Sequence, residues 1–151
     1  MNIERRIDTK QILQSAAAVG ELIEQEIARG IASENIFIAG FSQGGAVAYE
    51  TALSYSKPLG GVIALSTYFA TNETIDMHPA NSNIPIFIGH GSIDQIVPEI
   101  LGRQALQTLT EANYQPEYYH YPIAHSVSMP EIHDISVWLQ KQINARNSQA
   151  S

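Results

Sequence analysis

The chain has 151 residues, of which 44% are apolar and 15% charged, and its 8 Lys and Arg against 15 Asp and Glu give a formal net charge of −7. These values are typical of one globular domain, and they exclude a disordered chain and a coiled coil. An acidic balance argues against nucleic acid as a partner. Because the chain has no cysteine, disulfides, thiolate nucleophiles and Cys-based zinc sites are excluded.

Neither a membrane span nor a leader is predicted. No apolar run reaches the roughly 18 residues that a spanning helix needs. The segment Met1–Arg6 is not followed by the apolar core of a signal peptide. We therefore expect a single soluble domain over residues 1–151, cytoplasmic and without integral membrane association.

Helical and strand-like segments alternate along the chain. The first helix is expected over residues 9–29, with Asp8 as its N-cap, Gly30 at its end, and apolar residues at three-to-four spacing. Its inward face is predicted to carry Ile12, Ala16, Val19, Leu22 or Ile23, and Ile27. The remaining elements in chain order are a strand over 36–40, a helix over 43–55, a strand over 61–66, a loop over 71–83, a strand over 84–89, a helix over 99–112, a strand over 116–121 and a helix over 131–144.

The last helix has a start signal of its own. Ser128 and Glu131 stand at capping-box spacing, and an apolar stripe follows them. The residues expected to face inward are Ile132, Ile135, Trp138, Leu139 and Ile143. Residues 145–151 are expected to form a frayed tail.

This alternation predicts the fold class. A helix followed by four strand–helix repeats implies parallel strands joined by right-handed crossovers, with helices on both faces of the sheet. The first three strands are apolar on successive residues, as expected of strands whose two faces are both covered. We expect an α/β fold, a doubly wound open sheet of about four parallel strands. Functional groups in such sheets gather at the carboxyl ends of the strands.

The first strand runs directly into Gly40-Phe41-Ser42-Gln43-Gly44, a Gly-x-Ser-x-Gly pattern. Between a strand and a helix this pattern predicts a sharp turn that presents the Ser42 hydroxyl above the sheet from a strained backbone. Glycines two residues before and after Ser42 are expected because side chains there would collide with the neighbouring strand and helix. The N–H of Gln43 would open the next helix and point toward a developing oxyanion. A tight turn with an incidental serine is the alternative.

A serine nucleophile needs a base and an orienting carboxylate. In this architecture the chain order is Ser, then acid, then His. Asp94 follows the third strand and His125 follows the fourth, so both fall at the predicted carboxyl edge with Ser42.

The other histidines are less well placed for this role. His90 ends the third strand among glycines and is expected to have a structural role in the turn, whereas His120 lies within a strand. His78 precedes the third strand, in the irregular loop. A metal site drawn from His120, His125 and His133 lacks the close spacing of established metal sites, so no metal is expected.

Four motifs together resemble one known family, the phospholipase/carboxylesterase branch of the α/β-hydrolases, which includes bacterial carboxylesterases and acyl-protein thioesterases. They are Gly40-Phe41-Ser42-Gln43-Gly44-Gly45-Ala46, Leu59-Gly60-Gly61-Val62-Ile63-Ala64-Leu65-Ser66, Gly91-x-x-Asp94-x-x-Val97-Pro98 and Tyr121-x-x-x-His125. The resemblance implies a serine esterase for short to medium acyl esters or thioesters, without a cofactor. It implies Ser42 as nucleophile, Asp94 as acid, His125 as base and the N–H of Gln43 in the oxyanion hole.

The pocket residues are less well specified by the sequence. Tyr68 and Phe69 follow the second strand and are expected to line the acyl pocket, with ordinary loop packing as the alternative. A lysophospholipase is an alternative to a small-ester hydrolase, because the sequence does not decide the length of the acyl chain.

The resemblance also shows a departure. Members of the family begin earlier, with further strands and a His-Gly loop that supplies a second oxyanion donor. This chain is therefore expected to be a version truncated at its N-terminus, with one edge of the 36–40 strand open. The rival to an active esterase is a catalytically impaired fragment that folds as a homo-oligomer covering that edge.

Overall fold

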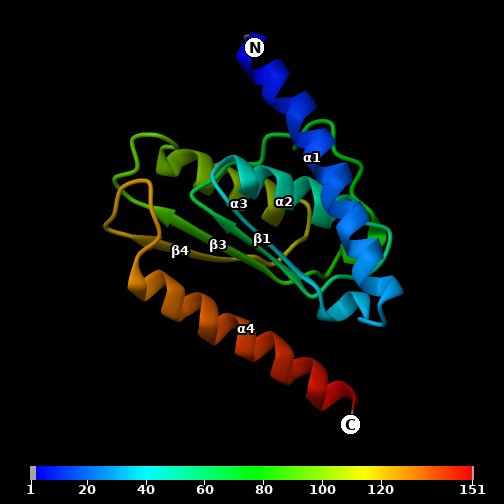
Figure 1. Cartoon of the computed structure of the whole chain (residues 1–151). Coiled ribbons are helices and arrows are strands. Elements are labelled where there is room, and N and C mark those ends of the chain that lie inside the picture. Colours follow the sequence, from blue (N-terminus) through cyan, green and yellow to red (C-terminus); the bar gives the residue numbers. More distant parts are fainter. Residues whose placement is uncertain (1–2, 151) are drawn as a thin grey trace.

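The computed structural model describes the backbone of residues 3–150 and the side chains of residues 9–148. Helices and strands alternate along the chain, as expected (Figure 1). The elements are α1 (Ile3–Ala28), β1 (Phe37–Phe41), α2 (Gln43–Ser54), β2 (Gly61–Leu65), β3 (Ile86–Gly91), α3 (Glu99–Glu111), β4 (Glu117–Tyr121) and α4 (Met129–Ala150), with single 3-10 turns at Ser33–Asn35 and Pro79–Asn81.

The four strands form one parallel sheet in the order β1-β2-β3-β4. Ala39 pairs with Ile63, Ile63 with Phe87, and Phe87 with Glu117, so chain order and spatial order coincide. This confirms the predicted α/β sheet of four parallel strands. Because all strands run the same way, the loops that follow them meet at a single edge.

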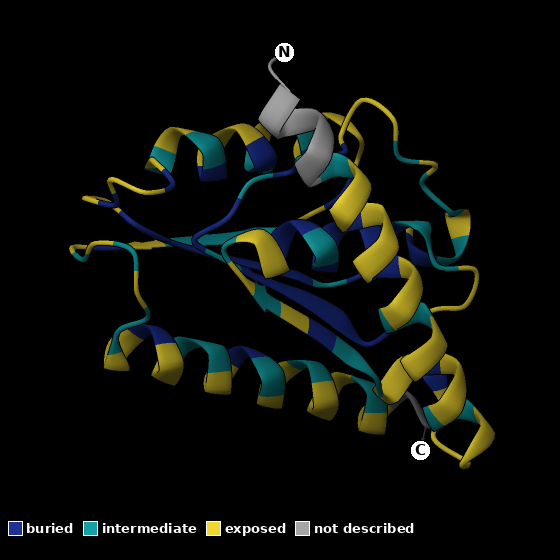
Figure 2. Ribbon diagram, turned by 45° about the horizontal axis from the view of Figure 1, so that its top comes forward, coloured by how far each residue is buried: buried dark blue, intermediate teal, exposed yellow. Residues whose placement is uncertain are grey.

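Helices cover both faces of the sheet, as predicted. In Figure 1 α1, α2 and α3 lie on one side and α4 lies alone on the other. Figure 2 shows buried strands between these layers. Successive strand residues point to opposite faces. Val62 and Ile88 therefore belong to the larger core under α1–α3, whereas Ile63 and Phe87 pack with Trp138 of α4.

The first helix begins earlier than the sequence predicts. It starts at Ile3, so Asp8 lies within the helix and is not its N-cap. Its predicted end is confirmed, because Gly30 has a φ of +106° and its N–H donates to the Ile27 carbonyl at 3.0 Å. Of the two candidates for the inward face, Ile23 is buried and Leu22 is exposed.

The last helix differs from its prediction at both ends of the apolar stripe. The Ser128 half of the predicted capping box is confirmed, since Ser128 Oγ accepts the Glu131 N–H at 3.3 Å. Trp138 is buried, with Ile135 and Leu139 packed beside it. Ile132 and Ile143 are exposed, because the face set by Glu131 and Trp138 turns both of them outward. The helix also continues to Ala150, through most of the segment expected to fray.

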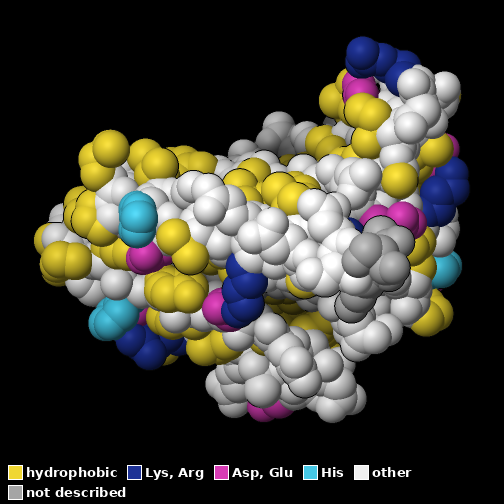
Figure 3. All heavy atoms as spheres, turned by 90° about the horizontal axis from the view of Figure 1, so that it is seen from below, with side chains coloured by type: hydrophobic (Ala, Val, Ile, Leu, Met, Phe, Trp, Pro, Cys, Tyr) yellow, Lys and Arg dark blue, Asp and Glu magenta, His cyan; other side chains and the backbone are white. Residues whose placement is uncertain are grey.

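The outer surface of α4 therefore carries apolar side chains. Figure 3 views the molecule from this side and shows hydrophobic side chains at the surface beside separate acidic and basic ones. Within the part of the chain that the structure describes, none of the helices combines the length and apolar character needed to cross a membrane.

Strand β1 stands first in the sheet and pairs with β2 alone among the described strands. Along its other side runs a groove of about 630 Å³ between α1 and α2. The groove is lined by residues that include Gln11, Gln14, Ile38, Ala39, Gly44 and Val47. The edge of β1 is thus open in the described structure, as the sequence predicts.

Candidate active site

The turn between β1 and α2 holds Ser42 in an unusual backbone conformation. Its φ of 57° and ψ of −126° lie outside the regions that non-glycine residues ordinarily occupy. The Ser42 N–H donates to the Leu65 carbonyl at 2.9 Å, and the Thr67 hydroxyl donates to the Ser42 carbonyl. Leu65 at the end of β2 and Thr67 just after it therefore bind both backbone polar groups of Ser42 and hold the turn in place. Sequence reasoning missed Thr67, although its place just after a strand could have indicated it.

The glycines around Ser42 do not contribute equally. A Cβ on Gly40 would overlap the Gly44 carbonyl and lie 2.6 Å from the Gly45 nitrogen. A Cβ on Gly45 would collide with the side chain of Thr67. Gly44 has nothing within 4 Å of its Cβ position, because it faces the groove beside β1. The steric requirement expected at Gly44 is thus wrong, and the crowded position on the helix side is Gly45.

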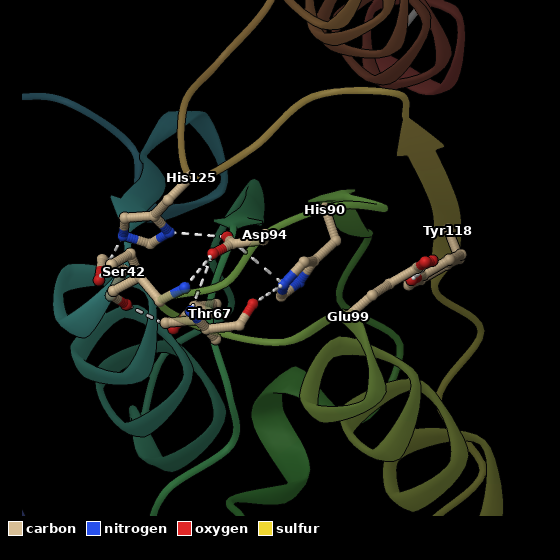
Figure 4. Close-up of polar contacts among 9 residues, drawn as sticks. Ser42, Thr67, His90, Asp94, Glu99, Tyr118 and His125 are labelled. Carbon is tan, nitrogen blue, oxygen red and sulfur yellow. Dashed lines mark hydrogen bonds and ion pairs between the residues drawn. The ribbon is translucent and has the colours of Figure 1, made fainter.

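Ser42, His125 and Asp94 come together from three separate strand ends (Figure 4). His125 Nε2 lies 3.1 Å from Ser42 Oγ, and His125 Nδ1 lies 2.7 Å from Asp94 Oδ2. A carboxylate can only accept, so Nδ1 carries the hydrogen and Nε2 is left to accept from the Ser42 hydroxyl. Phe41 packs against the His125 ring, with ring centroids 4.7 Å apart. An imidazole held in this way can take up the proton of a hydroxyl.

Asp94 is buried, yet its surroundings favour the charged form. Burial by itself would raise the pKa of Asp94. The hydrogen bond with His125 and those from the N–H groups of Val97 and Ile96, at 2.8 and 2.9 Å, outweigh burial and lower this pKa below its ordinary value. Asp94 is therefore ionised at neutral pH, as an acceptor for His125 must be.

A cavity of about 590 Å³ opens beside Ser42. Tyr68 and Phe69 line it, together with residues from the Asp94 loop and α3. Its apolar lining includes Ile96, Val97, Leu101 and Ala105, and its polar lining includes Asn72, Glu73, Gln104 and Thr108. Phe69 also belongs to the core, since its ring stacks on Tyr49 at a centroid distance of 5.0 Å. Phe69 therefore both lines the cavity and packs in the core.

Gln43 is the first residue of α2, so its N–H has no acceptor within the helix. This N–H follows directly on Ser42 and carries the partial positive charge of a helix N-terminus. Gln43 also lines the groove beside β1 and does not line the cavity at Ser42. Only the backbone N–H of Gln43 is therefore a candidate to donate a hydrogen bond beside the Ser42 hydroxyl.

His78, His90 and His120 have partners other than Ser42. His90 is fully buried in β3, and its Nε2 lies 2.7 Å from the Val97 carbonyl oxygen. His120 lies 3.5 Å from Glu99 at the surface, and the Nδ1 of His78 accepts the Ala80 N–H. Among the residues described, no group of three His, Asp or Glu side chains is arranged to hold a metal ion.

A family model and the related proteins agree on the family to which this chain is similar. A family model described as phospholipase/carboxylesterase matches residues 1–143. The chain is 37% identical to carboxylesterase SOBER1 of Arabidopsis thaliana over 94% of this chain and 64% of that protein. It is 32% identical to acyl-protein thioesterase 1 of Saccharomyces cerevisiae, over 93% of this chain and 64% of that protein. The chain thus spans just under two thirds of the length of these relatives.

Solved structures agree with the fold. The crystal structure of the F65L variant of Arabidopsis thaliana SOBER1 superposes with a TM-score of 0.82 at 36% identity, covering 87% of this chain and 65% of that one. The structure of esterase PE8 gives a TM-score of 0.84 at 20% identity, covering 93% of this chain and 67% of that one. At that lower identity the second likeness concerns the fold alone.

Proposed function

This chain belongs to the phospholipase/carboxylesterase family of the α/β-hydrolases, and on that premise we propose that it carries the catalytic apparatus of a serine carboxylesterase acting on short to medium acyl esters or thioesters. The observation that carries the proposal is the unbroken chain of hydrogen bonds from Ser42 through His125 to Asp94. The names of the relatives, carboxylesterase and acyl-protein thioesterase, support both kinds of acyl bond.

The proposed reaction begins with proton transfer from Ser42 Oγ to His125 Nε2. The oxygen attacks the acyl carbonyl, and the negative charge that develops on the carbonyl oxygen is stabilised by the Gln43 N–H. His125 then gives its proton to the leaving alcohol or thiol, which departs and leaves an acyl group on Ser42. A water molecule repeats the attack, with His125 again as base, and releases the acid. Asp94 holds the imidazole ring in its orientation throughout.

The cavity beside Ser42 is the proposed acyl site. Phe69, Leu101 and Ala105 offer an apolar wall to a hydrocarbon chain, which gains free energy by leaving water. Asn72 and Gln104 can donate hydrogen bonds to a polar part of the substrate. Tyr68, on the same loop as Phe69, is proposed as a second contact for the substrate.

The test is the Ser42→Ala variant, assayed with p-nitrophenyl acetate and with a fluorophosphonate label that reacts with activated serines. Wild-type protein is expected to be labelled at Ser42 and to release p-nitrophenol, and the variant to lose both. Ser136→Ala, at an exposed position on α4, is the matched control and should behave as wild type. Persistent labelling or turnover in Ser42→Ala would rule out Ser42 as the nucleophile.

A further inference from the structure

We propose that His90 is a positioning residue for Asp94, and that it acts through the backbone of Val97. His90 touches neither Ser42 nor the cavity beside it, so it is not a catalytic residue. The inference rests on the proposed function, because it assigns His90 a part in holding the acid of that same site. The hydrogen-bonded connection runs from His90 in β3 through Val97 to Asp94.

Both the N–H and the carbonyl of Val97 are hydrogen-bonded in this connection. Figure 4 shows His90 and Asp94, the two residues that the connection joins. His90 Nε2 lies 2.7 Å from the Val97 carbonyl oxygen, and the Val97 N–H donates to Asp94 Oδ1 at 2.8 Å. A carbonyl oxygen can only accept, so the hydrogen of the His90 ring is on Nε2. The residue that follows is Pro98, which has no N–H to offer the loop. His90 therefore holds the loop in the position from which Val97 reaches Asp94.

The burial of His90 makes this hydrogen bond costly to lose. His90, Val97 and Asp94 are all buried, so without the imidazole donor the Val97 carbonyl would have no water to replace it. His90 Nε2 lies 3.8 Å from Asp94 Oδ2, which is too long for a hydrogen bond. His90 is thus not a second hydrogen-bond donor to the carboxylate, and the hydrogen-bonded connection between the two residues passes through Val97.

Helix α3 holds the ring against the loop from the other side. A Cβ on Gly102 would lie 2.5 Å from His90 Nδ1, so a residue larger than glycine there would displace the imidazole. No described residue is hydrogen-bonded to this Nδ1. The ring is therefore fixed by the Val97 carbonyl at one nitrogen and by close packing at the other.

A purely structural role for His90 predicts a different result from a positioning role. His90→Leu fills much of the same space but has no donor, whereas His90→Gln carries an N–H at the end of its side chain that can reach the Val97 carbonyl. If packing alone matters, neither the loop nor Asp94 should depend on the donor. If the donor matters, the leucine variant should suffer more than the glutamine variant.

The first measurement is steady-state hydrolysis of p-nitrophenyl acetate. His90→Leu is expected to lower kcat by about 10- to 100-fold with KM nearly unchanged, since misplaced catalytic groups lower the rate without weakening binding. His90→Gln should recover most of this loss. Gly102→Ala, which displaces the ring but keeps it, should lower kcat in the same way. Gly20→Ala, whose Cβ meets nothing within 4 Å, is the control.

The second measurement does not need turnover. The proton in the His125–Asp94 hydrogen bond should give a low-field proton NMR signal in wild-type protein. The signal should weaken or shift in His90→Leu and return in His90→Gln, with thermal unfolding used to show that each variant is folded. If His90→Leu does not fold, Gly102→Ala and His90→Gln still decide the question.

Two results would overturn the proposal. One is a folded His90→Leu protein with wild-type kcat and an unchanged low-field signal. The other is a loss in His90→Leu that His90→Gln fails to recover, which would assign His90 to packing. Failure of wild-type protein to react with the fluorophosphonate would instead count against the proposed function, and the NMR comparison would still report on His90.

Discussion

Gly40 and Gly44 approach each other so closely that a Cβ on Gly40 would overlap the Gly44 carbonyl, whereas a Cβ on Gly44 would meet nothing within 4 Å. The two glycines of the Gly-x-Ser-x-Gly pattern therefore have different physical roles. One is needed for the close approach of strand and helix, and the other faces an open groove.

This difference predicts opposite results for two matched substitutions. Gly40→Ala should disrupt the turn at Ser42, lower the melting temperature and abolish fluorophosphonate labelling, because the new methyl group meets backbone that cannot move away. Gly44→Ala should fold and be labelled at close to the wild-type rate, since alanine also favours the helix that contains it. Equal loss in both variants would contradict the steric assignment.

The carboxyl of Glu131 predicts a dependence of stability on pH. Glu131 is fully buried beside Gly89, and burial, together with the nearby charge of Asp134, raises its pKa despite a backbone hydrogen bond with Ser128 that lowers it. A raised pKa means that the folded state holds its proton at a pH where the unfolded chain has lost it. The free energy of unfolding should therefore fall as pH rises from about 4.5, the ordinary pKa, through the raised pKa of Glu131 in the folded protein.

Glu131→Gln removes this charge while keeping the backbone N–H that is bonded to Ser128. The free energy of unfolding at pH 7 should increase by roughly 1 kcal/mol, with a smaller change at pH 4, where glutamate is largely protonated in both states. Urea unfolding at the two pH values measures the difference. Glu21→Gln, on the exposed side of α1, is the control and should show no such gain.

Two buried tyrosines predict opposite effects of losing a hydroxyl. The Tyr49 hydroxyl is buried without a hydrogen bond to any described residue, whereas the Tyr121 hydroxyl donates to Asp134 at 2.8 Å. Tyr49→Phe should leave the free energy of unfolding unchanged or raise it by up to about 1 kcal/mol, while keeping the ring stacked on Phe69. Tyr121→Phe should lower it by about 1–2 kcal/mol. Chemical unfolding of the two variants side by side provides the test.

The proposal that the cavity beside Ser42 is the acyl site predicts how a preference for acyl-chain length would change. Leu101 lines this cavity from α3, so Leu101→Phe should reduce the room for a chain and Leu101→Ala should enlarge it. The ratio of kcat/KM for p-nitrophenyl octanoate to that for acetate should fall in the first variant, by roughly 10-fold, and rise in the second. Equal changes in kcat/KM for both esters would indicate that the acyl chain binds elsewhere.

The arrangement of the site follows largely from patterns within short stretches of sequence. Alternating strand-like and helical segments predict a parallel sheet, and a parallel sheet brings the residues after its strands to one edge. Ser42, Asp94 and His125 each follow a different strand, so their meeting could be expected before any distance was known. The large separation of these residues along the chain does not prevent their meeting, because the sheet topology determines which strand ends are neighbours.

Helix boundaries and faces were less predictable. Residues 3–8 contain nothing that stops a helix, so the first helix extends back past Asp8. Ile132 fits the apolar stripe as well as Ile135 does, yet only Ile135 packs against the sheet. The rotation of α4 is set by the large ring of Trp138 and by its contacts with Phe37 and Phe87 on two strands.

The sequence was sufficient for the order of elements, the parallel sheet and the three residues that converge beyond it, because local periodicity and strand direction encode them. Only the tertiary structure showed the close contacts between segments, such as the packing of Gly45 against Thr67 and the hydrogen bond between His90 and the Val97 carbonyl. Such contacts depend on the ångström-scale packing of segments, and no pattern within a single segment records what will lie against it.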